Sequence, residues 1–199
     1  LVGAAASPGG EILVQDVGVN PTRSGLLEVL EAMGAVVLRS RARSDAGEPV
    51  ADLTVRGSSL RATQIDAALV PRLLDEIPIL AVAAALAEGE TVISGAAELR
   101  VKEVDRLAAL TEELSCLGVQ ITEEKTGLRI VGGQRLKGAV VRSHGDHRIA
   151  MALAIAGLLA EGETHIQDVE CVKTSFPGFA ALLSKVAPEC GIREVEESS

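Results

Sequence analysis

One short stretch carries the side chains best suited to chemistry. Residues 99–106 read Leu-Arg-Val-Lys-Glu-Val-Asp-Arg, so that Lys102 and Arg106 are four residues apart and Glu103 follows the lysine. If the segment opens a helix, residues four apart share one face, and a helix N-terminus favours anions. We therefore expect two cations and one carboxylate to face a substrate that carries phosphate or carboxylate groups and exchanges a proton.

A second set of polar residues precedes two apolar runs. Asp146, His147 and Arg148 stand directly before one run, and Asp75 stands shortly before another. We expect Asp146 to cap a helix and Arg148 to project from the helix start toward an anion. For Asp75, a simple interaction with the helix dipole remains the alternative to a role in a site.

Two histidines three residues apart raise the question of a metal site. His144 and His147 flank Asp146, but such spacing alone is weak, and no further cluster of Cys or His completes a ligand set. Arg148, next to His147, would also repel a cation. The sequence therefore predicts no metal.

The chain repeats one plan three times. Each copy has an Ala-rich apolar run that should form a buried helix, then a glycine and a short strand, then an amphipathic helix, a glycine and another strand. The buried helices are expected at 1–6, 79–87 and 149–160, the amphipathic helices at 26–33, 107–117 and 179–186, and the strands after them at 36–38, 119–121 and 191–193. We predict an α/β (α+β) fold in which three sheets surround the buried helices.

The repeat gives three basic loops equivalent positions, each just before an amphipathic helix. They span 20–24, 100–106 and 173–177. Ordinary helix capping explains the first loop well and the second poorly, and for the third loop capping and a functional role both stay open. If these loops meet the residues before the buried helices, the candidate site comprises Asp75, Lys102, Glu103, Arg106, His147, Arg148 and Lys173.

The composition limits the kinds of partner. The formal net charge is −9 and aromatic residues make up 1% of the chain, so neither nucleic acid nor an anionic membrane is expected to bind. The 47% hydrophobic fraction indicates a folded protein with an aliphatic core. The glycine motifs of nucleotide sites are missing, and the apolar runs are shorter than the roughly 20 residues that span a bilayer.

The cysteines and the start of the chain suggest its setting. Cys116, Cys171 and Cys190 have no paired spacing, so we expect small core residues in a reducing cytoplasm and no disulfide framework. The chain begins at Leu1 inside an apolar run, and the first copy lacks the strand that should precede its buried helix. We therefore expect residues 1–199 to form one domain of a longer protein.

Five motifs, in this order and spacing, resemble the 5-enolpyruvylshikimate-3-phosphate synthase family. They are Asn-Pro-Thr-Arg at 20–23, Asp-Glu-Ile-Pro at 75–78, Arg-Val-Lys-Glu-Val-Asp-Arg at 100–106, Asp-His-Arg-Ile-Ala-Met at 146–151 and Thr-Ser-Phe-Pro at 174–177. The resemblance implies two domains, each an inverse α/β barrel of three βαβαββ units. It also implies that this chain is the C-terminal domain, that the N-terminal domain is its partner, and that the chain alone is inactive.

The same resemblance implies a reaction. The family transfers the enolpyruvyl group of phosphoenolpyruvate to the 5-hydroxyl of shikimate 3-phosphate and releases phosphate, by addition and elimination, in aromatic amino acid biosynthesis. It uses no metal and no organic cofactor. Glyphosate competes with phosphoenolpyruvate in this family, so it is an expected inhibitor.

The resemblance also implies roles for the residues that donate or accept protons. Asp75 would take the proton of the attacking hydroxyl and hold the shikimate ring. Glu103 would exchange the proton at the methylene carbon of phosphoenolpyruvate. Lys102 would contact shikimate 3-phosphate and the reacting oxygens.

The remaining matched residues would bind phosphoenolpyruvate. Arg106 and Arg148 would hold its carboxylate or phosphate, which a guanidinium fork matches well, and His147 would border them. Lys173 would be a further contact, although it lies one residue further from the Phe-Pro pair than is usual in the family. Glu98 stands where the family often has Asn, so this chain departs from the family at one shikimate contact.

Two other interpretations stay open. The chain could be a non-catalytic binding domain that keeps the fold. It could also belong to the enolpyruvyl transferase that acts on UDP-N-acetylglucosamine, which shares the fold but is not expected to carry the motif at 100–106.

Overall fold

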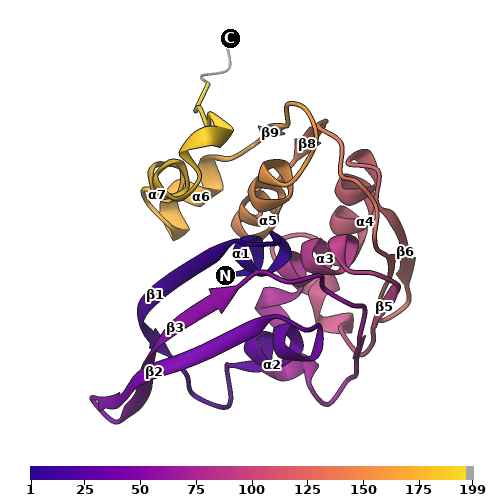
Figure 1. Ribbon diagram of the computed structural model, residues 1–199. Helices are drawn as coiled ribbons and strands as arrows, with labels where there is room; N and C mark the ends of the chain where they lie inside the picture. The colour runs from indigo at the N-terminus through magenta and orange to yellow at the C-terminus, as the bar shows by residue number, and fades with distance from the viewer. Residues whose placement is uncertain (196–199) are drawn as a thin grey trace.

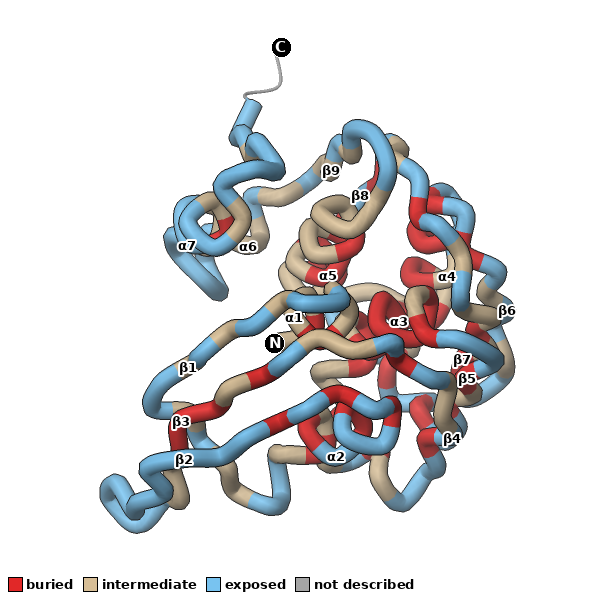
Figure 2. The backbone as a smooth tube through the Cα atoms, viewed as in Figure 1, coloured by how far each residue is buried: buried red, intermediate tan, exposed pale blue. Residues whose placement is uncertain are grey.

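The three apolar runs form helices that pack against one another in a computed structural model, which describes residues 1–195 (Figure 1). They are α1 (Val2–Ala6), α3 (Ile77–Leu86) and α5 (His147–Leu158), and each contacts the other two. Helix α3 is apolar along its whole length and buries eight residues (Figure 2). A helix of this kind is stable only where protein surrounds it, which explains its central position.

Three sheets lie on different sides of these helices, as predicted. The first has the order β1–β3–β2, the second β4–β5–β7–β6, and the third consists of β8 and β9. The strands are β1 (Glu11–Gly18), β2 (Val36–Asp45), β3 (Glu48–Arg56), β4 (Gln64–Ile65), β5 (Glu90–Ile93), β6 (Gln120–Glu124), β7 (Gly127–Val131), β8 (Val140–Arg142) and β9 (His165–Gln167). The parallel pairs β4–β5 and β8–β9 join the strands before and after a buried helix, so the second and third copies share one plan.

The amphipathic helices are α2 (Gly25–Ala32), α4 (Arg106–Cys116) and α7 (Phe179–Val186). Helix α4 buries Leu107, Leu110 and Leu114 at spacings of three and four, which places them on one face. That face packs against α3 and α5. The start of α4 is thereby held next to the starts of two buried helices, and these three helix starts carry the candidate site.

Short helical turns complete the fold. They are η1 (Val70–Arg72), η2 (Leu74–Glu76), η3 (Ala97–Val101), α6 (Glu170–Ser175) and η4 (Pro188–Cys190). In the described part of the chain, no helix has the length and apolar character needed to cross a membrane.

Two glycines show how closely the first two copies repeat one another. Gly57 and Gly132 directly follow the last strand of their copies, and their N–H groups donate to the carbonyls of Gly10 and Gly89. A Cβ atom at Gly57 would lie 1.7 Å from the carbonyl oxygen of Ser7, and one at Gly132 would lie 2.0 Å from that of Ala87. Only glycine therefore allows the strand to pass so close to the end of the buried helix.

The third copy departs from the prediction in two places. The strand expected at 191–193 is not formed, because these residues follow η4 without a neighbouring strand to pair with among the described residues. The loop expected at 173–177 begins inside helix α6, which ends at Ser175. Pro177 explains this end, because a proline disfavours helical geometry at the residue before it.

The prediction of core cysteines was wrong. Cys116 and Cys190 are exposed and Cys171 is partly buried, and all three are free thiols. Cys116 ends helix α4 and falls on its solvent-facing side, since the buried stripe of that helix runs through its leucines.

Candidate active site

Asp75 is the meeting point of three cationic side chains. It lies in η2, directly before α3, whose Pro78 suits the first turn of a helix. Its Oδ1 atom lies 3.3 Å from Nη1 of Arg106 and 3.9 Å from Nζ of Lys102. Its Oδ2 atom lies 3.3 Å from Nη2 of Arg148, whose Nη1 also donates to the Asp75 carbonyl at 3.1 Å. The carboxylate side chain remains 45% exposed, so it is held in place and still open to a ligand.

Arg106 joins three carboxylates. Its side chain is 1% exposed, and its Nε atom lies 2.7 Å from Oδ2 of Asp146, which is fully buried. Nη2 lies 2.7 Å from Oε2 of Glu103, and Nη1 faces Asp75. Arg106 therefore holds the carboxylates of Asp75 and Glu103 close to one another.

Asp146 has the capping role that the sequence predicted and a second role that it did not. Its Oδ1 atom accepts from the N–H groups of Arg148 and Ile149 at the start of α5. Burial by itself raises the pKa of this carboxyl group. The hydrogen bond and charge of Arg106, together with the two N–H groups, outweigh burial and hold the pKa below its ordinary value.

The lowered pKa of Asp146 predicts a loss of stability in acid. The unfolded chain takes up this proton at a higher pH than the folded chain does. The contribution of Asp146 is thus complete above its ordinary pKa and disappears as the pH falls through the folded-state pKa. We expect the urea midpoint of the wild type to fall on acidification below about pH 4. The urea midpoint of Asp146→Asn should already be lower than that of the wild type near neutral pH, and it should fall less on acidification. Parallel pH profiles for the two proteins would contradict this.

Lys102 and Arg106 come together, although not by the route that the sequence predicted. They do not share one helix face: Lys102 follows η3 in an extended conformation, and Arg106 begins α4 after the cap residue Asp105. The turn between them directs both side chains to Asp75. The ammonium of Lys102 also lies 3.0 Å from Oε1 of Glu98.

His147 and Lys173 differ in their relation to this cluster. His147 begins α5 beside Arg148 and is partly buried. Lys173 lies on α6, where its Nζ atom is 2.8 Å from Oε1 of Glu170, and it is not among the cations that pair with Asp75.

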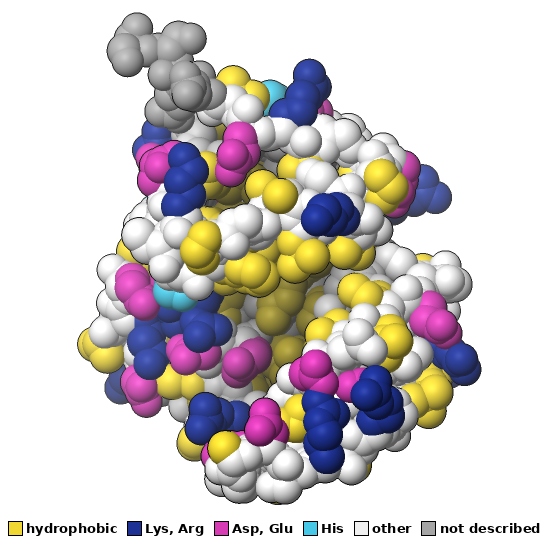
Figure 3. Space-filling model, turned by 90° about the vertical axis from the view of Figure 1, so that its left-hand side faces the viewer, with side chains coloured by type: hydrophobic (Ala, Val, Ile, Leu, Met, Phe, Trp, Pro, Cys, Tyr) yellow, Lys and Arg dark blue, Asp and Glu magenta, His cyan; other side chains and the backbone are white. Residues whose placement is uncertain are grey.

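Two cavities open beside Asp75. One, of about 210 Å³, reaches the basic loop at 20–24 through Thr22 and Arg23. The other, of about 220 Å³, runs from Asp75 and Arg148 along α5 to Phe179. Figure 3 shows charged side chains gathered beside a hollow with a largely apolar floor. The site thus combines ionic groups at one end with apolar walls.

Glu76 lies next to Asp75 on both cavity walls. Burial, and to a smaller extent the charge of Asp75, raise the pKa of its carboxyl group, while Arg148 opposes them. Its side chain does not belong to the ion pairs around Asp75.

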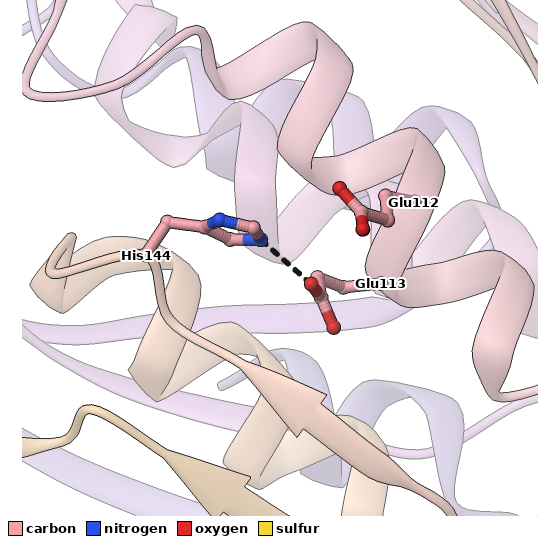
Figure 4. A group of neighbouring side chains, drawn as sticks. All are labelled: Glu112, Glu113 and His144. Atoms are coloured by element: carbon pink, nitrogen blue, oxygen red, sulfur yellow. Dashed lines mark hydrogen bonds and ion pairs between the residues drawn. The ribbon is translucent and has the colours of Figure 1, made fainter.

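One group of potential metal ligands exists in the described residues, and it is not the one considered from the sequence. It consists of Glu112, Glu113 and His144, whose ligand atoms lie within 4.8 Å of one another (Figure 4). Asp146 and His147 are not members. Sequence reasoning missed Glu113, for which the available signal was its spacing of seven residues from Arg106.

Known proteins resemble this chain in sequence and in fold. The sequence profile of "EPSP synthase (3-phosphoshikimate 1-carboxyvinyltransferase)" matches residues 1–183. The 3-phosphoshikimate 1-carboxyvinyltransferase of Desulforudis audaxviator is 57% identical over 189 residues, which are 95% of this chain and 44% of that protein. That of Herpetosiphon aurantiacus is 56% identical, over 89% of this chain and 41% of that protein.

A solved structure gives the same result for the fold. The EPSP synthase from Acinetobacter baumannii superimposes with a TM-score of 0.90 at 40% sequence identity, over 98% of this chain and 45% of that one. The chain therefore spans less than half the length of the relatives that it matches.

Proposed function

Because the chain belongs to the EPSP synthase family, we propose that it forms one wall of the active site of a 3-phosphoshikimate 1-carboxyvinyltransferase. In this proposal the enzyme transfers the enolpyruvyl group of phosphoenolpyruvate to the 5-hydroxyl of shikimate 3-phosphate and releases phosphate. The other wall comes from the N-terminal domain, which is covalently joined or a separate chain. The relatives are more than twice as long as the stretch that they share with this chain, which supports a second domain.

The observation that carries the proposal is the convergence of Lys102, Arg106 and Arg148 on the Asp75 carboxylate, with Glu103 on the same guanidinium as Asp75. A reaction between two anionic substrates needs cations to hold them and carboxylates to move protons. Each requirement is met here within one group of side chains.

We assign the proton transfers to the two exposed carboxylates of the cluster. Asp75 accepts the proton of the 5-hydroxyl as its oxygen attacks C2 of phosphoenolpyruvate, and Glu103 delivers a proton to the methylene carbon. In the elimination, the methyl carbon returns a proton to Glu103, the bond between C2 and the phosphate oxygen breaks, and phosphate leaves with the proton that Asp75 had taken up. Asp75 and Glu103 have side chains that are 45% and 49% exposed, so substrate can reach both.

The cations bind the substrates in this proposal. Arg148 and Arg106 hold phosphoenolpyruvate, with His147 at the border, and Lys102 contacts shikimate 3-phosphate. Glyphosate, as a phosphonate with a carboxylate, competes for the same guanidinium groups. A contact from Lys173 to phosphoenolpyruvate, and the cytoplasm as the location, stay predictions.

The proposal predicts activity only when both halves are present. We expect no phosphate release from this chain alone, and release that requires both substrates once the N-terminal half of a relative is added. Phosphate is measured against time, with each half alone and each substrate alone as controls. A reconstituted pair that releases no phosphate would refute the proposed reaction.

Two arms of the same experiment separate the alternatives. UDP-N-acetylglucosamine in place of shikimate 3-phosphate tests transfer of the enolpyruvyl group to the UDP-sugar. We expect no such transfer, because the relatives are named 3-phosphoshikimate 1-carboxyvinyltransferases. Titration of this chain alone with shikimate 3-phosphate tests a non-catalytic binding domain, which would bind tightly without the other half.

A further inference from the structure

Glu113 is a buried carboxylate that the proposed mechanism does not use. It lies on α4, seven residues after Arg106, and is 3% exposed. Its Oε2 atom accepts the backbone N–H of Arg142 at 2.8 Å, and its Oε1 atom lies 2.6 Å from Nε2 of His144 (Figure 4). A buried carboxylate is tolerated only when its oxygens have such partners, so these two contacts are the reason for its position.

Both partners of Glu113 belong to the loop that delivers Arg148 to the site. Arg142 ends β8, and its N–H lies at the edge of that strand that faces away from β9, where Glu113 takes the place of a further strand. The N–H of the next residue, Ser143, instead donates to Gln167 of β9. The carboxylate thus joins α4 to the third sheet at the point where the loop begins.

The loop then folds back through two residues with positive φ. His144 has φ 55° and Gly145 has φ 78°. A residue other than glycine seldom adopts this conformation and keeps it only where surrounding contacts hold it. Glu113 supplies that contact for His144, and the fully buried Ser143 accepts the N–H of Gly145 at 3.0 Å.

Helix α4 therefore contacts the loop 142–146 at both of its ends. Residues seven apart on a helix lie on one face, two turns from each other. Arg106 binds Asp146 at the end of the loop, and Glu113 binds Arg142 and His144 at its start. The two contacts fix where α5 begins, and so where the guanidinium of Arg148 lies relative to Asp75.

We propose that Glu113 is a positioning residue that holds the loop 142–146 against α4 and thereby sets the approach of Arg148 to the anionic substrate. The kinetic part of this inference rests on the proposed function, and the structural part does not. Glu112 provides a matched control, because it is adjacent on the same helix and exposed, and the hydrogen bonds of the loop do not involve it.

The structural arm measures backbone amide exchange in the 199-residue chain. In Glu113→Ala we expect the amides of Arg142 and Gly145 to exchange at least about tenfold faster than in the wild type, because opening of the loop becomes easier. Glu113→Gln keeps an oxygen for Arg142 and should restore most of the protection, and Glu112→Gln should change nothing. Unchanged exchange at both amides in a folded Glu113→Ala would overturn the proposal.

The kinetic arm uses the reconstituted two-half enzyme. We expect Glu113→Ala to raise the KM for phosphoenolpyruvate about tenfold with a smaller effect on kcat, since a displaced Arg148 weakens ground-state and transition-state binding alike. His144→Ala, which removes one partner from a 29% exposed position, should raise KM less and keeps the test available if Glu113→Ala does not fold. Wild-type KM values in both variants would overturn the proposal.

The outcomes separate this inference from the proposed function and from a metal site. If the wild-type pair releases no phosphate, the proposed function fails, while amide exchange still decides whether Glu113 holds the loop. If a chelator raises the KM of the wild type as much as Glu113→Ala does, the carboxylate serves a bound cation with Glu112 and His144, and the positioning proposal is wrong.

Discussion

Replacement of Arg106 by alanine is expected to lower the free energy of unfolding by about 3–5 kcal/mol, the usual cost of breaking a buried ion pair. The change leaves Asp146, which is fully buried, without the guanidinium that lies 2.7 Å from its Oδ2 atom. It also frees Asp75 and Glu103, which Arg106 holds together. We therefore expect phosphate release by the reconstituted enzyme to be abolished. Urea unfolding and the phosphate assay measure the two effects.

Arg129 offers a matched control for this variant. It also pairs with two carboxylates, Glu90 and Glu124, but its side chain is 42% exposed. Exposed ion pairs contribute little to stability, so Arg129→Ala should keep a urea midpoint close to that of the wild type. Arg106→Lys keeps the charge without the planar fork, and we expect it to recover part of the stability and little activity. Similar losses for Arg106→Ala and Arg129→Ala would show that burial of the cluster has no energetic consequence.

Replacement of Asp75 by asparagine is expected to lower kcat by about 10²–10⁴-fold, the range for removal of a general base, while the protein stays folded. Asparagine has nearly the same shape, and the side chain is 45% exposed, so little desolvation is at stake. The change also removes the negative charge between Lys102, Arg106 and Arg148. Anion binding should therefore persist, and the KM for phosphoenolpyruvate should not rise.

The split between kcat and KM makes this prediction specific. Glu76→Gln is the control, because Glu76 is adjacent to Asp75 and lies outside the ion pairs. It should change kcat only a few-fold. An Asp75→Asn enzyme with wild-type kcat would exclude Asp75 as the base, and a large rise in KM with unchanged kcat would make it a binding residue only.

Much of the fold could be predicted from the spacing of apolar residues. The all-apolar run that became α3 and the leucine stripe of α4 have different periodicities, and these identify one helix as buried and the other as half-exposed. The prediction failed at 191–193 because a strand needs a partner, and its own sequence does not say whether one is present. Cys116 was misplaced because residue type alone does not give the face of a helix.

The candidate site was predictable in its members and less so in its contacts. The motifs identified Asp75 and the three cations that the structure brings to its carboxylate, Lys102, Arg106 and Arg148. Lys102 and Arg106 were expected on one helix face, and the structure instead joins them through a turn. Lys173 was expected in the same group, and it pairs with Glu170 on α6.

By itself the sequence determined which residue types are available and where helices begin, because capping and apolar periodicity act over a few residues. Only the tertiary structure decided the partners of the buried charges. Arg106 meets Asp146 across 40 positions of the chain, and Glu113 meets His144 across 31. Such pairs form only when α4 and α5 pack together and exclude water, so their energy comes from a contact that no local pattern records.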